Sequence, residues 1–190
     1  MEILRRVALM NFIVILWHQF EEYRFPGGEP AITNLAMQPS DKGPSDRYPL
    51  NQNNAMWINL VAAYICYLLP VFFPNILWIG FMPIFFGLSQ LIMHAYLTPK
   101  KLHSFYSPGL AAVFFGHLPL GIYWFYYVIT NGLLHWYDIA IGLFYQVLFI
   151  AVFMLRIGYG VLQSPKSKYP FPTKEFERGG YAQKIRNLKK

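Results

Sequence analysis

The chain has 190 residues, of which 55% are hydrophobic, 19% aromatic and only 13% charged. Sixteen Lys and Arg against nine Asp and Glu give a formal net charge of +7, and the mean hydropathy is +0.30. This composition excludes a disordered chain, and without a strict sequence period it also excludes collagen and a coiled coil. A single cysteine, Cys66, excludes a disulfide framework and a cysteine-based zinc site.

Five apolar segments are predicted to cross a membrane, which takes about 20 mostly apolar residues per helix. The apolar part of the first segment is short, so its helix reaches across only if it also includes Glu21 and Glu22. The other four segments carry almost no charge, and a chain this small has no polar residues left to cover four buried helices. The predicted spans are residues 3–24, 55–73, 75–97, 108–130 and 139–155.

The predicted fold is an all-α, polytopic membrane helix bundle over residues 1–162, followed by a basic cytoplasmic tail over residues 163–190. Loops rich in Lys and Arg stay in the cytoplasm. With five spans, one orientation places 14 of the 16 Lys and Arg on a single side. We therefore predict a multi-pass protein of the cell or inner membrane with its N-terminus outside and its C-terminus in the cytoplasm.

Placing an ionisable side chain inside the bilayer costs free energy, so such residues within a predicted span indicate a functional site. His18, Glu21 and Glu22 are spaced i, i+3, i+4 and share one face of the first predicted helix. Two further histidines, His94 and His117, lie in the third and fourth spans. At 1.5 Å per residue, the three histidines lie roughly 6 to 13 Å from the same membrane face. The sequence therefore predicts one His/Glu site in the cytoplasmic half of the bundle.

Neutral imidazoles together with a carboxylate suit Zn²⁺ or Fe²⁺. One or two divalent ions are therefore expected, and no nucleotide cofactor. The predicted metal ligands are His18, Glu22, His94 and His117. Glu21 and Glu22 are the predicted catalytic carboxylates, with Glu21 as general base or additional ligand. Polar residues expected to support the ligands or contact substrate are Gln90, Asn51 and Asn54, although helix capping also explains the two asparagines.

The leading hypothesis is a membrane-embedded metal-dependent enzyme, a hydrolase or an oxidoreductase, that acts on a lipid or another apolar substrate. One alternative is a metal-independent His/Glu acid-base isomerase. Others are a cation-coupled transporter, a lipid-binding protein and a structural scaffold, although the chain lacks the matching broken helices of a transporter repeat. The basic tail is expected to contact anionic lipid, and it contains no nucleic-acid-binding motif.

The segment His18-Gln19-Phe20-Glu21-Glu22 resembles the motif of the HXXEE-domain family of small integral membrane proteins. The likeness covers most of residues 10–130, and its further elements are Phe25-Pro26-Gly27-Gly28, Gln90-x-x-x-His94, and Ser107-Pro108-Gly109 with His117 beyond. No reaction is assigned to this family. The resemblance therefore implies that His18, Glu21 and Glu22 are important for function, but it does not indicate which reaction they carry out.

Overall fold

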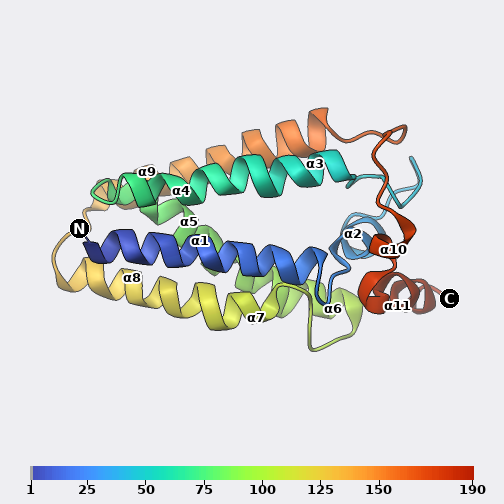
Figure 1. Cartoon of the computed structure of the whole chain (residues 1–190), viewed down its shortest axis with the longest axis horizontal. Helices are drawn as coiled ribbons and strands as arrows, with labels where there is room; N and C mark the ends of the chain where they lie inside the picture. The colour runs from blue at the N-terminus through green and yellow to red at the C-terminus, as the bar shows by residue number, and fades with distance from the viewer. Residues whose placement is uncertain (1) are drawn as a thin grey trace.

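The computed structural model describes residues 2–190, except for the side chain of Ala62, and over this range the chain is helical with no strand. Five helices in this range are long and apolar enough to cross a membrane: Glu2–Tyr23, Gln52–Phe72, Leu77–Leu102, Leu110–Thr130 and Trp136–Val161. They form one bundle, with the N-terminus at one end and the C-terminus at the other (Figure 1). The five-span helical architecture predicted from the sequence is confirmed.

The first span is one helix, and the others are assembled from shorter segments. The first is α1 (Glu2–Tyr23), and the second joins α3 (Gln52–Met56), η2 (Trp57–Ala63) and α4 (Tyr64–Phe72). The third joins α5 (Leu77–Leu91), η3 (Ile92–Leu97) and α6 (Thr98–Leu102), and the fourth joins α7 (Leu110–Ala112), η4 (Val113–His117) and α8 (Leu118–Thr130). The fifth joins α9 (Trp136–Leu148) and η5 (Phe149–Val161). The segments η2 to η5 have the wider π-helical hydrogen-bond pattern, which is frequent at functional sites.

The second span begins at a reciprocal cap. The Asn51 side chain accepts from the backbone N–H groups of Asn53 and Asn54 at 2.9 and 3.2 Å, and the Asn54 side chain accepts from the Asn51 N–H at 2.7 Å. Their amide groups donate to the carbonyls of Leu162 and Pro49. Both asparagines therefore cap this helix, which is the alternative that the sequence left open for them.

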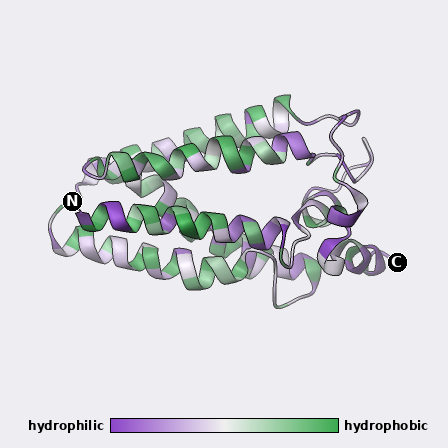
Figure 2. Ribbon diagram, in the orientation of Figure 1, coloured by the Kyte–Doolittle hydropathy of each residue, from purple (hydrophilic) through white to green (hydrophobic). Residues whose placement is uncertain are grey.

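The interior of the bundle is apolar, and much of its outside is apolar too. A core of buried side chains on α1, α5 and α8 includes Leu4, Val7, Phe81 and Trp124. Large apolar side chains are nevertheless exposed on all five spans, as they are in a protein surrounded by lipid. Hydrophobic residues make up most of the length of the long helices (Figure 2). Hydrophilic residues gather at the end of the bundle that carries the C-terminus.

The chain folds back over that polar end. The connection between the first two spans contains α2 (Glu29–Ile32) and η1 (Thr33–Met37), and the C-terminal segment contains α10 (Thr173–Phe176), η6 (Arg178–Gly180) and α11 (Tyr181–Leu188). Phe171, Phe176 and Ala182 pack against this connection at Ala31 and Leu50. The tail predicted from its basic charge is thus a folded element, in which Phe171, Phe176, Ala182 and Ile185 are buried.

Candidate functional site

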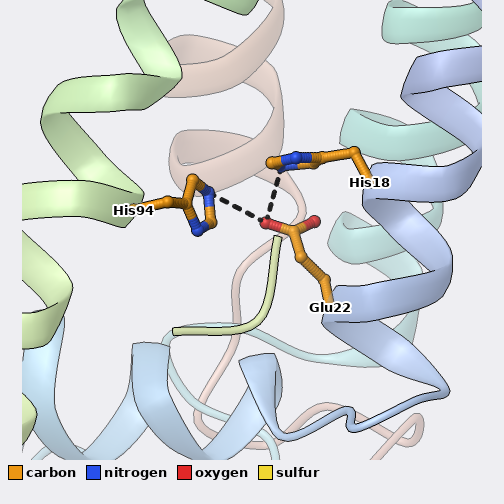
Figure 3. A group of neighbouring side chains, drawn as sticks. All are labelled: His18, Glu22 and His94. Atoms are coloured by element: carbon orange, nitrogen blue, oxygen red, sulfur yellow. Dashed lines mark ion pairs between the residues drawn. The ribbon is translucent and has the colours of Figure 1, made fainter. Parts of the chain in front are cut away.

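Three side chains from two spans meet near the polar end of the bundle (Figure 3). His18 and Glu22 lie one turn apart on α1, and His94 comes from η3. The Nε2 atoms of both histidines face the same carboxylate oxygen, Glu22 Oε1, at 3.2 Å for His18 and 3.5 Å for His94. The histidines are buried, and the Glu22 side chain is only 13% exposed. The sequence spacing therefore places these three residues in one cluster, as predicted.

The donor atoms of this cluster fit a divalent ion. One ligand atom from each of the three residues lies within 4.8 Å of the other two. Two imidazole nitrogens and one carboxylate are the ligands of several catalytic zinc sites and of the facial triad of Fe²⁺ oxygenases, in which further positions stay open. The Nδ1 atom of His18 is buried and has no hydrogen-bond partner among residues 2–190. Because the other ring nitrogen, Nε2, is the one that faces Glu22, the unpaired Nδ1 is a polar group that a water or a substrate atom would satisfy.

The loop between the third and fourth spans fits closely over both imidazoles. Gly109 has φ +95°, and a Cβ atom there would lie 2.8 Å from Cε1 of His18 and 2.8 Å from Cε1 of His94. Ser107 is buried, and its hydroxyl donates to the His94 carbonyl at 2.8 Å and lies 3.4 Å from His94 Nδ1. Neither residue is among the predicted site residues, although Ser107-Pro108-Gly109 is one of the segments that carry the family resemblance.

His117 lies beside this cluster, outside the group of converging ligand atoms. Its Nδ1 atom is 2.9 Å from Oδ1 of Asn11, and its ring centroid is 5.8 Å from that of His18. Its buried Nε2 atom has no partner among the described residues. Among the described residues, the converging ligand atoms come from His18, Glu22 and His94, whereas His117 is paired with Asn11; its predicted role as a fourth ligand stays a prediction.

Glu21 stabilises the start of the fourth span. Its carboxylate accepts a hydrogen bond from the Tyr106 hydroxyl at 3.1 Å and from the backbone N–H of Ala112 at 3.0 Å. The first N–H groups of a helix are unpaired and favour an anion. Burial and the neighbouring Glu21 raise the pKa of Tyr106 above its ordinary value. The Glu21 carboxylate is thus used as a helix cap, and its predicted role as a base or ligand stays a prediction.

A cavity of about 360 Å³ opens beside the cluster, and His18, Glu22 and His94 form part of its wall. Its other walls come from η2, α5, η5 and the connection that contains α2 and η1. Much of this lining is apolar, with Ile15 and Phe149 among its side chains. Gln90 also lines the cavity, one helical turn before His94. The sequence predicted it to lie near this histidine. A mainly apolar cavity with a few converging polar groups is the usual form of a small-molecule site.

Glu29 is a further carboxyl in this cavity wall, and the sequence analysis did not single it out. It accepts a hydrogen bond from the Thr33 hydroxyl at 2.5 Å. Burial, together with the negative charge of Glu22, raises the pKa of Glu29 to about 8. No sequence signal separates it from solvated loop carboxylates, because it lies in a Pro- and Gly-rich connection whose folding depends on the C-terminal segment.

The comparisons with known proteins point to one family. A family model described as a protein of unknown function with HXXEE motif matches residues 9–124. This range contains the whole cluster and the loop that covers it. No curated protein and no solved structure matches the chain.

Proposed function

The chain belongs to the HXXEE-motif family of proteins of unknown function, and we propose that it is a membrane-embedded, metal-dependent enzyme acting on a lipid or another apolar substrate. One observation carries the proposal: His18, Glu22 and His94 converge in the wall of a largely apolar cavity of about 360 Å³. Apolar walls favour an apolar substrate, and the polar groups are concentrated where a reacting centre would lie.

In this proposal His18, Glu22 and His94 hold one Zn²⁺ or Fe²⁺ ion. Such an ion supplies a coordinated water with a lowered pKa, or polarises a substrate oxygen. The covering loop fixes the His94 ring and excludes water from its far side, through Ser107 and Gly109. Glu29 faces the same cavity and is the carboxyl available to exchange a proton with a substrate near neutral pH.

We further propose that the C-terminus faces the cytoplasm and the N-terminus the outside, since this orientation keeps 14 of the 16 Lys and Arg on the cytoplasmic side. The cluster then lies in the cytoplasmic half of the bundle, and the lysines of α11 lie next to anionic lipid headgroups. A C-terminal tag should be digested by protease only after intact cells are permeabilised.

A metal-independent reaction is the second candidate, and the short contacts within the cluster favour it. Glu22 Oε1 lies within hydrogen-bond reach of both imidazoles, at 3.2 and 3.5 Å. Two histidines bridged by a carboxylate can move a proton across a bound lipid, as an acid-base isomerase requires. Such an activity would survive chelation.

Elemental analysis of the purified full chain separates these two candidates. After incubation with Zn²⁺ or Fe²⁺ and removal of excess ion, the enzyme proposal predicts about one ion per chain, and loss of that ion in His18→Ala and His94→Ala. His103→Asn alters an exposed histidine of the covering loop and should keep the ion. A folded wild-type chain that retains no ion would overturn the metal proposal and leave the proton relay.

A further inference from the structure

A groove of about 380 Å³ lies on the outer surface between α1 and the second span. The two spans pack together along α4, but they separate toward the polar end, where α3 and η2 lie (Figure 1). The lining of the groove is mainly apolar and open: Phe20 is 52% exposed, Met56 50% and Leu60 45%. Because both helices cross the membrane, this groove faces the hydrocarbon of the bilayer.

Only a thin partition divides this outer groove from the inner cavity of the cluster. Gln19, Tyr23 and Asn59 line both spaces. The Gln19 amide donates to the Asn59 carbonyl at 2.9 Å, and the Asn59 amide donates to the Tyr23 hydroxyl at 2.9 Å. The partition is therefore held by hydrogen bonds between polar side chains and backbone, which a change of rotamer can break and remake.

The partition is also directly attached to the cluster. Gln19 follows His18 in α1, and Tyr23 follows Glu22. On the water side the cavity is covered by α2 and η1, which are themselves packed under the C-terminal segment. The wall made by Gln19, Tyr23 and Asn59 is thus the one that the cavity shares with the outer groove.

We propose that this groove is a lateral portal, through which the acyl chain of a membrane lipid passes between α1 and η2 into the cavity of the cluster. The chain moves from one apolar environment to another, so entry requires only that the partition open. The side chains of Gln52 and Glu175, which contact Pro170 and Arg178, mark the polar end of the groove, where the lipid headgroup would lie at the water interface. The reaction of the lipid after entry rests on the proposed function, whereas the entry of its acyl chain through the groove is tested separately.

A lysophosphatidylcholine with a diazirine near the end of its single acyl chain tests the route in phosphatidylcholine vesicles that contain the full chain. After photolysis, mass spectrometry should locate label on cavity residues that are absent from the outer groove, such as Phe86 and Met154. Met56→Trp and Leu60→Trp fill the groove and should each lower this label about tenfold. Tyr23→Phe, which removes one partner of Asn59, should label faster than wild type.

Leu148→Trp is the matched control. It fills another lipid-facing hollow, of about 400 Å³, which shares no residue with the cavity, and it should leave the labelling unchanged. All variants are compared as monodisperse protein, and two different groove substitutions guard against the misfolding of one. Label confined to the outer groove, or equal cavity label in both groove-filled variants, would overturn the portal.

The same experiment separates the portal from the enzyme proposal. His18→Ala and His94→Ala should lose the metal ion and keep the cavity label, because neither residue forms the partition. Cavity label in a wild-type chain that retains no ion would support the portal and refute the metal enzyme. A bound ion without cavity label would support the metal enzyme and refute the portal.

Discussion

Glu21 and Glu22 are consecutive residues of α1, and their carboxylates serve different parts of the molecule. Glu22 lies 3.2 Å from His18 and 3.5 Å from His94, whereas Glu21 accepts from the backbone of Ala112 and from Tyr106. Successive helical residues point about 100° apart, so one carboxylate faces the cluster and the other faces the start of the fourth span. The HXXEE motif thus places one carboxylate beside the two histidines and the other at the start of a helix.

Substitution of the two glutamates should therefore give opposite results. Glu21→Gln removes the charge that caps the fourth span and should lower the free energy of unfolding by about 1 kcal/mol, while the ion stays bound. Glu22→Gln should lose the ion. In the metal-free protein it should lower the free energy of unfolding less than Glu21→Gln does. Thermal unfolding in detergent and elemental analysis measure the two effects, and loss of the ion from Glu21→Gln would identify Glu21 as a ligand.

Gly109→Ala should disrupt the cluster without touching a ligand. The added methyl group would lie only 2.8 Å from the Cε1 atoms of His18 and His94. In addition, the backbone of residue 109 has a positive φ, which strains any residue other than glycine. We expect metal affinity to fall at least about tenfold, as for other groups that position ligands. Gly132→Ala is the control, since it also has positive φ but no atom within 4 Å of the added methyl. It should affect only stability.

His117→Gln tests whether the proposed ion has three or four ligands. Because His117 is paired with Asn11 and lies beside the three converging ligand atoms, this variant should still bind one ion, with affinity reduced about tenfold. His94→Gln should bind none. Competition with a chelator of known affinity gives both values. If the two variants lost the ion equally, His117 would be a fourth ligand after all.

Glu29 should make the stability of the fold depend on pH. Its pKa is about 8 in the folded protein, raised from an ordinary value of 4.5. Between these values the unfolded chain releases a proton that the folded chain keeps, so wild-type stability should fall as the pH rises from about 5 to about 9. Glu29→Gln should lack this pH dependence and be more stable than wild type at the upper end, by on the order of 5 kcal/mol.

Thermal midpoints in detergent across this pH range measure the effect. Asp41→Asn removes an exposed carboxylate from the same connection and serves as the control. Parallel pH profiles for wild type and Glu29→Gln would contradict the buried position of the Glu29 carboxyl.

The spans could be predicted because lipid imposes a simple requirement of length and apolar content, which five segments meet. Their ends were less accurate. The second span begins at Gln52, three residues before its predicted start, because the cap at Asn51 starts the helix inside a polar segment. The third continues to Leu102 through Thr98 and Pro99, since proline is tolerated at the start of a new helical turn.

The site was predictable as far as residue spacing and depth determine it. Helix periodicity places His18 and Glu22 on one face, and depth places His94 at their level. The rotation of each helix about its own axis depends on packing between distant segments. The sequence alone therefore could not show that His117 turns toward Asn11, that Glu21 turns toward Ala112, or that Glu29 lines the cavity.

The fold-back of residues 171–185 onto the first connection has a consequence for biosynthesis. The connection leaves the ribosome before four of the five spans, but the aromatic side chains that bury it, Phe171 and Phe176, are translated after all of them. Until then Ala31 and Ile32, which have no exposed surface in the folded protein, lack their packing partners. The water-side wall of the cavity is thus completed last, so a ribosome that stalls before this segment leaves an inserted bundle with an unsealed site.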